Sequence, residues 1–113
     1  MATVYRRGFN LKDSLNDVEV ADFWRFMLEE AAPIVQKVKG VNAIRYYSGA
    51  GALRADCIIV IEMDDAGVYE RLLLDPDMHK LLGRLYGAID LKTSTQSFRR
   101  QVTPQLVRAL TGS

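Results

Sequence analysis

The chain has 113 residues, of which 49% are hydrophobic and 26% are charged, as is ordinary for one soluble globular domain. Its 15 basic residues nearly balance its 14 acidic ones, so neither nucleic acid nor an anionic membrane surface is expected as a partner. The one cysteine, Cys57, lies in an apolar run, where we expect a buried thiol in a reducing compartment. There is no run of about 20 apolar residues and no apolar signal-peptide region, so we expect a cytoplasmic protein without a membrane span.

The first two expected elements differ in their hydrophobic period. Residues 3–12 alternate, which predicts a strand, and one face of that strand would carry Thr3, Tyr5, Arg7, Phe9 and Leu11. Residues 18–39 follow the helical period, and Gly40 ends the helix. The apolar stripe of this helix contains Val20, Trp24, Met27, Leu28, Ala31, Val35 and Val38. Pro33 should kink the helix, since it removes a backbone hydrogen bond. Phe26 falls off the stripe, so we expect either an exposed aromatic or a contact outside the monomer's own core.

The rest of the chain supplies three more predicted strands and two helical segments. Strands are predicted at residues 41–48, 55–63 and 91–101, with a glycine-rich turn between the first two. A short helix follows "DDAG", and Asp75 can cap a second helical segment that begins at Pro76. The order is therefore strand, helix, strand, strand, helical segment, strand. It predicts a ferredoxin-like α+β unit, in which a four-stranded antiparallel sheet carries helices on one face. We expect one domain over residues 1–101 and a C-terminal tail over residues 102–113.

The strand at residues 55–63 indicates how the chain assembles. Cys57, Ile59 and Met63 lie on one face, but Ile58 and Val60 on the other face are apolar as well. A sheet with helices on one side and water on the other should alternate apolar with polar residues. The chain has enough helix to cover one face only. We therefore expect a homodimer in which a second copy covers the other face, and the alternative is that the C-terminal tail covers it.

Three stretches resemble segments of a known superfamily. "FWRFMLEEAAPIV" resembles the first helix of EthD-like proteins, with Pro33 in place and Ala31 where a histidine is frequent. "VKGVNAIRYY" resembles the helix end, glycine and second strand of the dimeric α+β barrels, and "LDPDMHKLL" resembles the segment in which a short helix carries a histidine near its start. The chain thus resembles the dimeric α+β barrel superfamily, which includes antibiotic-biosynthesis monooxygenase-like, EthD-like and stress-responsive barrel families. The resemblance covers about residues 2–101 and implies that two sheets pack face to face into a barrel.

The only histidine, His79, is the first candidate for a catalytic residue. On a helical wheel from Pro76 onward, His79 and Tyr86 lie in line on one side of an apolar face centred on Leu82. Met78 lies on the other side of that face, and Gly83 would leave a gap beside His79 and Tyr86. An imidazole, a phenol and a gap beside an apolar face suit a small hydrophobic ligand, either aromatic or polyketide-like. The alternative is that His79 is a partly exposed residue without a role.

Three further residues could contribute to a ligand site. Trp24, at the centre of the first helix's stripe, would form the opposite wall, unless it is simply part of the core. Arg45 and Tyr47 share one face of the second strand. Arg45 in so apolar a strand needs an anionic partner, which is either a carboxylate such as that of Glu62 or a ligand.

Two functions are consistent with these residues. The first is a cofactor-free monooxygenase or isomerase that acts on a small hydrophobic, enolisable substrate. His79 would act as the general base or would polarise the substrate in such an enzyme, and Tyr86 or Tyr47 would hydrogen-bond the enolate. The second is a non-catalytic barrel that binds a small ligand or serves as a stress-related structural dimer. We expect no cofactor and no metal, since one histidine and one buried cysteine cannot build a typical zinc site. A haem-binding barrel with His79 as proximal ligand is a third possibility.

Overall fold

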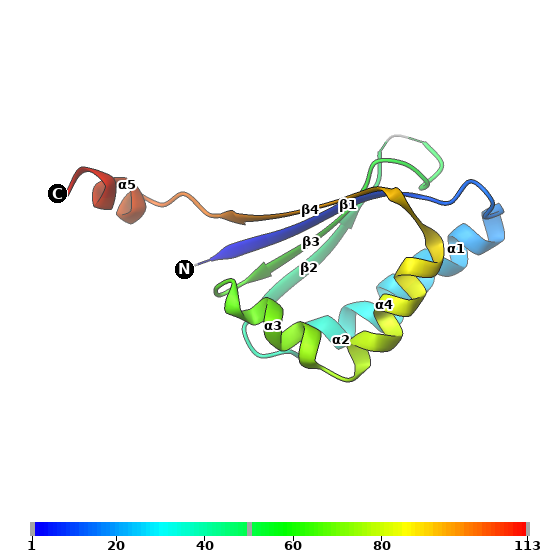
Figure 1. Ribbon diagram of the computed structural model, residues 1–113, viewed down its shortest axis with the longest axis horizontal. Coiled ribbons are helices and arrows are strands. Elements are labelled where there is room, and N and C mark those ends of the chain that lie inside the picture. The colour runs from blue at the N-terminus through cyan, green and yellow to red at the C-terminus, as the bar shows by residue number, and fades with distance from the viewer. Residues whose placement is uncertain (1, 50, 113) are drawn as a thin grey trace.

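The computed structural model describes residues 2–49 and 51–112 (Figure 1). Its elements in chain order are β1 (Thr3–Leu11), α1 (Asp17–Phe26), the π-helical turn η1 (Met27–Ala31), α2 (Ala32–Gln36), β2 (Val41–Tyr47), β3 (Cys57–Met63), α3 (Gly67–Leu74), α4 (Asp77–Ala88), β4 (Ile89–Arg100) and α5 (Pro104–Thr111). The strands form one antiparallel sheet in the order β2-β3-β1-β4. The helices α1 to α4 lie on one face of this sheet (Figure 1). The predicted ferredoxin-like α+β fold is therefore confirmed.

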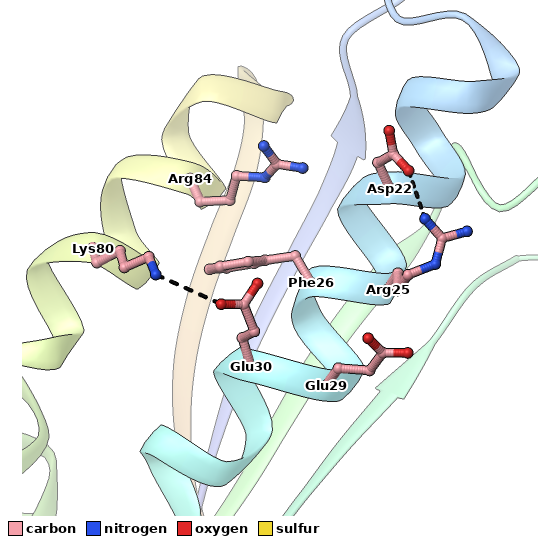
Figure 2. Close-up of a pocket in the computed structure, with 7 residues that line it drawn as sticks. All are labelled: Asp22, Arg25, Phe26, Glu29, Glu30, Lys80 and Arg84. Carbon is pink, nitrogen blue, oxygen red and sulfur yellow. Dashed lines mark hydrogen bonds and ion pairs between the residues drawn. The ribbon is translucent and has the colours of Figure 1, made fainter.

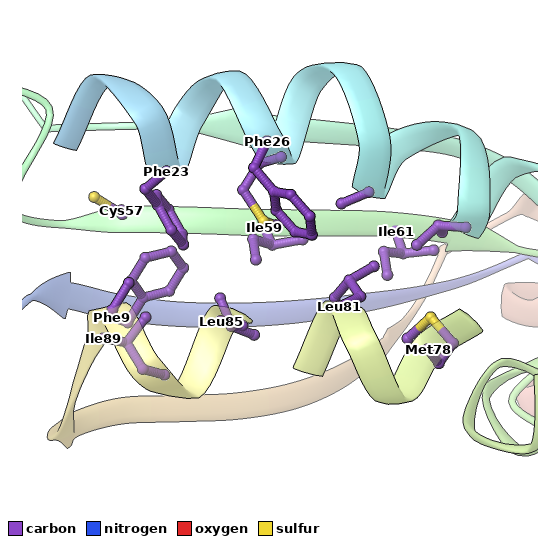
Figure 3. Packing of buried hydrophobic residues seen from close by; sticks show 14 of the residues in the cluster. Phe9, Phe23, Phe26, Cys57, Ile59, Ile61, Met78, Leu81, Leu85 and Ile89 are labelled. Carbon is purple, nitrogen blue, oxygen red and sulfur yellow. The ribbon is translucent and has the colours of Figure 1, made fainter. Parts of the chain in front are cut away.

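The core lies between the sheet and the helices. The inward residues of β3, which are Cys57, Ile59, Ile61 and Met63, are at most 6% exposed. Phe23 of α1 and Leu85 of α4 close over them (Figure 3). Full burial of such side chains contributes about 1.5–3 kcal/mol each relative to water. Burial also raises the pKa of the Cys57 thiol, which favours the inert protonated form.

The first helix runs without a break from α1 through η1 into α2, and it begins with a capping box. The Asn16 side chain accepts a hydrogen bond from the backbone of Glu19, whose carboxylate accepts one from the backbone of Asn16. The irregularity expected from Pro33 takes the form of the π-helical turn just before it. There the N–H of Ala32 reaches back five residues to the carbonyl of Met27. The wider turn accommodates a proline ring that would clash with the carbonyl of Glu29 in a regular α-helix.

Two expectations for this helix are wrong. Phe26 is part of the monomer's own core at 8% exposure, while Leu28 is 61% exposed. The reason is that α1 packs against α4 as well as against the sheet, so its buried surface is broader than one stripe and is turned toward α4. Figure 3 shows Phe26 pointing into the cluster that lies between the two helices. Leu28 falls on the side of the helix that neither the sheet nor α4 covers.

The other face of the sheet carries no helix. Ile58 and Val60 of β3 lie on this open face and stay half-buried. The tail does not cover them, because α5 has no buried residue and lies beyond the end of the sheet (Figure 1). Within the described residues, no helix is long and apolar enough to cross a bilayer.

Candidate functional site

The structure places His79 on the solvent side of α4. The buried residues of this helix are Met78, Leu81, Leu85 and Ala88. The apolar face is therefore not centred on Leu82 as predicted but is turned away from His79, because α4 packs toward α1 and the sheet together. The His79 side chain is exposed and has no hydrogen-bond or ion-pair partner among residues 2–49 and 51–112. Met78 is a core residue at 6% exposure. The catalytic role of His79 stays a prediction.

Gly83 and Tyr86 of α4 have different neighbours. A Cβ added to Gly83 would meet no atom within 4 Å, so the expected gap is present. It opens toward α1, however, in a groove that Gly83 shares with Phe23, Arg84 and Gly87. Tyr86 instead lies against β1, where the guanidinium of Arg7 stands 5.4 Å from its ring centroid. Tyr86 does not line the groove at Gly83.

Trp24 is mainly a core residue. Its ring is 8% exposed and makes an edge contact with Tyr46 at 5.9 Å between centroids. Its indole Nε1 donates a 2.9 Å hydrogen bond to the carbonyl of Leu53. The ring also forms the base of a small hollow of about 200 Å³ at the outer edge of β2. We call this hollow the β2-edge hollow, and it is lined by Trp24, Leu28, Tyr46, Tyr47, Ser48 and Leu53.

Arg45 and Tyr47 lie on the open face of the sheet. Arg45 donates a 2.7 Å hydrogen bond to the Glu62 carboxylate on the neighbouring strand, so its anionic partner is the carboxylate. The side chains of this pair are 49% and 41% exposed. Tyr47 is 52% exposed. The predicted site residues therefore occupy the core, the outside of α4 and the open sheet face, and a single protomer does not bring them together.

The structure does bring together a cluster that sequence reasoning missed, and its centre is Arg7. Arg7 points from β1 toward the helices and is only 5% exposed. Its Nε donates to the hydroxyl of Tyr5 at 3.0 Å, its Nη1 to the hydroxyl of Ser94 at 3.1 Å and its Nη2 to the hydroxyl of Tyr86 at 3.4 Å. Within the described ranges, no carboxylate lies within ion-pair distance of Arg7. A buried cation is thus held by neutral hydroxyls alone.

The hydroxyl of Tyr5 extends this cluster toward β4. It donates a 2.8 Å hydrogen bond to Oε1 of Gln96, and Tyr69 of α3 donates to the same oxygen at 3.4 Å. Burial raises the pKa of Tyr5 to about 12, so this phenol stays protonated at neutral pH. Burial alone would lower the pKa of Arg7, but its contacts with Tyr5 and Tyr86 outweigh that effect and raise it. We call Tyr5, Arg7, Tyr86, Ser94 and Gln96 the Arg7 cluster.

The Arg7 cluster lies at a partly open edge of the protomer. The edge strand β4 is only partly covered by helices, so Ser94 is half-buried and Gln96 is exposed. Tyr86 is 41% exposed and Phe98 is 48% exposed. The rings of Phe98 and Tyr69 meet edge to face, with 5.1 Å between their centroids. Solvent therefore reaches a surface on which a buried guanidinium, three hydroxyl groups and aromatic rings converge.

The sequence signal that could have identified Arg7 is the alternation of inward and outward residues in β1. Arg7 occupies an inward position between Tyr5 and Phe9, where an apolar residue is expected. A charged residue at such a position needs a partner. Arg45 is exposed and paired with Glu62, whereas Arg7 is buried, so the need for a partner is greater at Arg7.

A second concave surface lies outside the core, between α1 and α4 (Figure 2). It is lined by Asp22, Arg25, Phe26, Glu29, Glu30, Lys80 and Arg84. Its charges are largely paired, as in the 2.6 Å contact between Arg25 and Asp22. The guanidinium of Arg84 covers the Phe26 ring at 5.4 Å. This groove offers no unpaired buried group. No three metal-ligating side chains lie together anywhere in the described part of the chain.

No protein-family model matches the chain, and no curated protein matches its sequence. Solved structures match over most of its length. A mutant of SnoaB, described as a cofactor-independent oxygenase from Streptomyces nogalater, gives a TM-score of 0.69 at 13% identity and covers 91% of this chain and 97% of its own. An EthD-family protein from Bacillus halodurans gives 0.63 at 10% identity, with 90% and 100% covered. A dimeric ferredoxin-like protein of unknown function from Thermobifida fusca gives 0.70 at 13% identity, with 89% and 92% covered.

The chain has the fold of these proteins. The resemblance to the α+β barrel superfamily is confirmed at the level of the fold, and identities this low carry it no further. The neighbours include both an oxygenase and a protein of unknown function, so the fold alone does not select between the two predicted functions.

Proposed function

We propose that this protein binds a small aromatic ligand carrying an oxyanion or an enolisable carbonyl, and that the ligand's oxygen lies on Arg7 and Tyr86. The observation that carries the proposal is the burial of Arg7 with no carboxylate partner among residues 2–49 and 51–112. Removing an ion from water costs several kcal/mol, and a good ion pair normally offsets that cost. Neutral hydroxyls replace the lost hydration of the guanidinium only in part. An anionic ligand would supply the missing charge-assisted hydrogen bonds.

The surroundings of the Arg7 cluster favour an aromatic ligand over a simple anion. Tyr5, Tyr69 and Phe98 form a group of rings beside it, with centroid separations of 4.9 Å to 5.3 Å. Phe98 and Tyr69 keep part of their surface exposed at the edge of the sheet. A flat ligand could stack or pack edge-on against these rings while its oxygen accepts hydrogen bonds from Arg7.

The same arrangement suits the chemistry of an enolate. When a carbon next to a carbonyl loses a proton, negative charge develops on the carbonyl oxygen, and a fixed guanidinium stabilises it. An isomerase would return the proton to another carbon, whereas an oxygenase would let the enolate give electrons to molecular oxygen. His79 is the predicted base, and it lies two helical turns, or about 10 Å, along α4 from Tyr86. Only an extended ligand would therefore span both residues.

The choice between an enzyme and a binder rests on turnover. A His79→Ala variant that consumes substrate at the wild-type rate would exclude His79 as the base.

Binding itself can be tested with 2-hydroxy-1,4-naphthoquinone, a coloured enolate at neutral pH, against 1,4-naphthoquinone, which lacks the acidic hydroxyl. Wild-type protein should bind the hydroxyquinone about 10- to 100-fold more tightly, since hydrogen bonds to charged groups contribute about 1.5–3 kcal/mol. Equal affinities would contradict an oxyanion site.

We also propose that the protein is a homodimer that pairs through the open face of its sheet. Ile58 and Val60 are uncovered apolar residues on that face, and the Arg45–Glu62 pair lies beside them. The neighbour from Thermobifida fusca is described as dimeric. Sedimentation at micromolar concentration should give twice the chain mass of 12.7 kDa. A single species of 12.7 kDa would contradict the dimer.

A further inference from the structure

The helix α5 is complete in its local structure, but none of its residues is buried against the described part of the chain. The Thr103 hydroxyl caps its first turn by accepting from the N–H of Leu106, and Gly112 ends it in a left-handed conformation at φ 71°. One side of the helix carries Leu106, Val107 and Leu110, with Arg108 opposite. Val107 is 51% exposed and Leu110 is 88% exposed. An isolated helix of 8 residues is not stable in water, so α5 needs a surface to pack on.

The β2-edge hollow is an apolar surface of about 200 Å³ at the outer edge of the sheet. Its exposed members Leu28, Tyr47 and Leu53 are 61%, 52% and 51% exposed. Tyr47 also belongs to the open sheet face, where it lies opposite Ile58. The hollow is therefore continuous with the face that we propose to pair with a second copy.

The α5 helix cannot reach the hollow of its own chain. β4 ends at the end of the sheet where Thr3 pairs with Arg100 and Met63, whereas the hollow lies at the other end, beside Tyr47. The two points are about 20 Å apart along the strands and three strand spacings, or about 14 Å, apart across the sheet. Residues 101–103 span at most about 10 Å. Figure 1 shows α5 projecting away from the end of the sheet opposite the loop that precedes β3.

The charges of the two segments are complementary. Residues 99–112 contain Arg99, Arg100 and Arg108 and no acidic residue. Residues 13–31, which include α1 and η1 beside the hollow, contain six acidic residues and one basic residue, Arg25. Glu29, adjacent to Leu28, has no ion-pair partner within residues 2–49 and 51–112. A basic arm that approaches this acidic helix would be attracted to it.

We propose that residues 101–112 act as an exchanged arm, in which α5 of one copy docks its Leu106, Val107 and Leu110 side chains in the β2-edge hollow of a second copy. A two-fold axis that lies between the sheets and runs diagonally across the strands places the partner's sheet with both its ends and its edges exchanged. The arm of each protomer then leaves its sheet at the end where the partner's hollow lies, and the exchange is reciprocal. The inference rests on the proposed dimer and not on the proposed ligand.

Disulfide trapping in the full-length chain tests this arm. Leu110→Cys and Leu28→Cys are made in separate chains, mixed under reducing conditions and then oxidised gently, while the buried Cys57 is left in place. A Leu110→Cys chain mixed with a Leu74→Cys chain is the matched control, since Leu74 is an exposed leucine of α3 at 80% exposure. The first mixture should give a mixed covalent dimer as its main product, and the control mixture should give only background.

A chain that carries both Leu28→Cys and Leu110→Cys separates the remaining outcomes. Covalent dimers from this chain support exchange, whereas an internally bridged monomer would show that α5 folds back on its own chain and would overturn the proposal. Bridging no greater than in the Leu74→Cys control would also overturn it. Sedimentation of the reduced wild-type chain tells the two proposals apart. A reduced dimer without bridging rejects the arm alone, and a reduced monomer rejects both the arm and the sheet pairing.

Discussion

The guanidinium of Arg7 donates from Nε to the hydroxyl of Tyr5 over 3.0 Å, in a place where both side chains are 5% exposed. The bond joins the only buried charged side chain of the described residues to a phenol that is itself bonded to Gln96. Arg7 thus has a fixed position and an incomplete set of partners. A residue held in this way contributes poorly to stability and is well placed for binding.

Replacing Arg7 should not destabilise the fold. In Arg7→Met the buried charge is removed and a side chain of similar length fills the core, so the free energy of unfolding should stay the same or rise by about 1–2 kcal/mol. Urea unfolding at one fixed protein concentration measures this change. A loss above about 2 kcal/mol would show that Arg7 is mainly a structural residue.

Alkaline pH should weaken the fold through Tyr5. Burial raises the pKa of Tyr5 to about 12, from 10.0 for a free tyrosine. Below pH 10 both states keep the proton, but between pH 10 and pH 12 the unfolded chain loses it first, so stability falls as pH rises. Unfolding free energies measured at pH 9, 10 and 11 should fall less steeply in Tyr5→Phe. Burial also raises the pKa of Tyr46, so part of the slope should persist. An unchanged slope would contradict the role of Tyr5.

Gly40 should be irreplaceable, whereas Gly87 should not. Gly40 has φ 97°, and an added Cβ would lie 2.6 Å from Cγ2 of Val68, so Gly40→Ala should lose about 1–3 kcal/mol of unfolding free energy. Gly87 lies within α4 with nothing near an added Cβ, so Gly87→Ala should gain about 0.5–1 kcal/mol. Urea melts of both variants give the comparison. Equal effects would contradict this account of the turn before β2.

A charge on the open sheet face should separate the protomers. Val60 lies at the centre of β3 on that face, so Val60→Asp should convert the dimer to a 12.7 kDa species in sedimentation. Leu74→Asp places the same charge on an exposed leucine of α3 and should leave the dimer intact. If Val60→Asp remains a dimer at micromolar concentration, the protomers pair through another surface.

The fold was predictable because its signals are local. The alternation in β1, the apolar run of β3 and the helical period of α1 each identify an element without knowledge of the rest of the chain. Helix orientation was less predictable, since it depends on which neighbours a helix meets. The contact between α1 and α4 buries Phe26 and turns His79 outward, and no periodicity within either helix contains that contact.

The candidate site was harder to predict than the fold for a related reason. Arg7, Ser94 and Tyr86 meet because β1 pairs with β4 and α4 lies beside them, so the cluster depends on long-range pairing. Arg7 alone was visible in the sequence, as a charge at an inward strand position. The sequence predicts either a carboxylate such as that of Glu62 or a ligand as the partner of Arg45, and in the structure it is Glu62.

Binding of 2-hydroxy-1,4-naphthoquinone to Arg7→Met tests the central claim most directly. Arg84→Met is the matched control, because Arg84 is an exposed arginine of α4 outside the Arg7 cluster. We predict that Arg7→Met weakens binding about 10- to 100-fold, in line with the loss of a charge-assisted hydrogen bond, while Arg84→Met stays within about twofold of wild type. Folded Arg7→Met protein that binds the hydroxyquinone as tightly as wild type would contradict the proposed site.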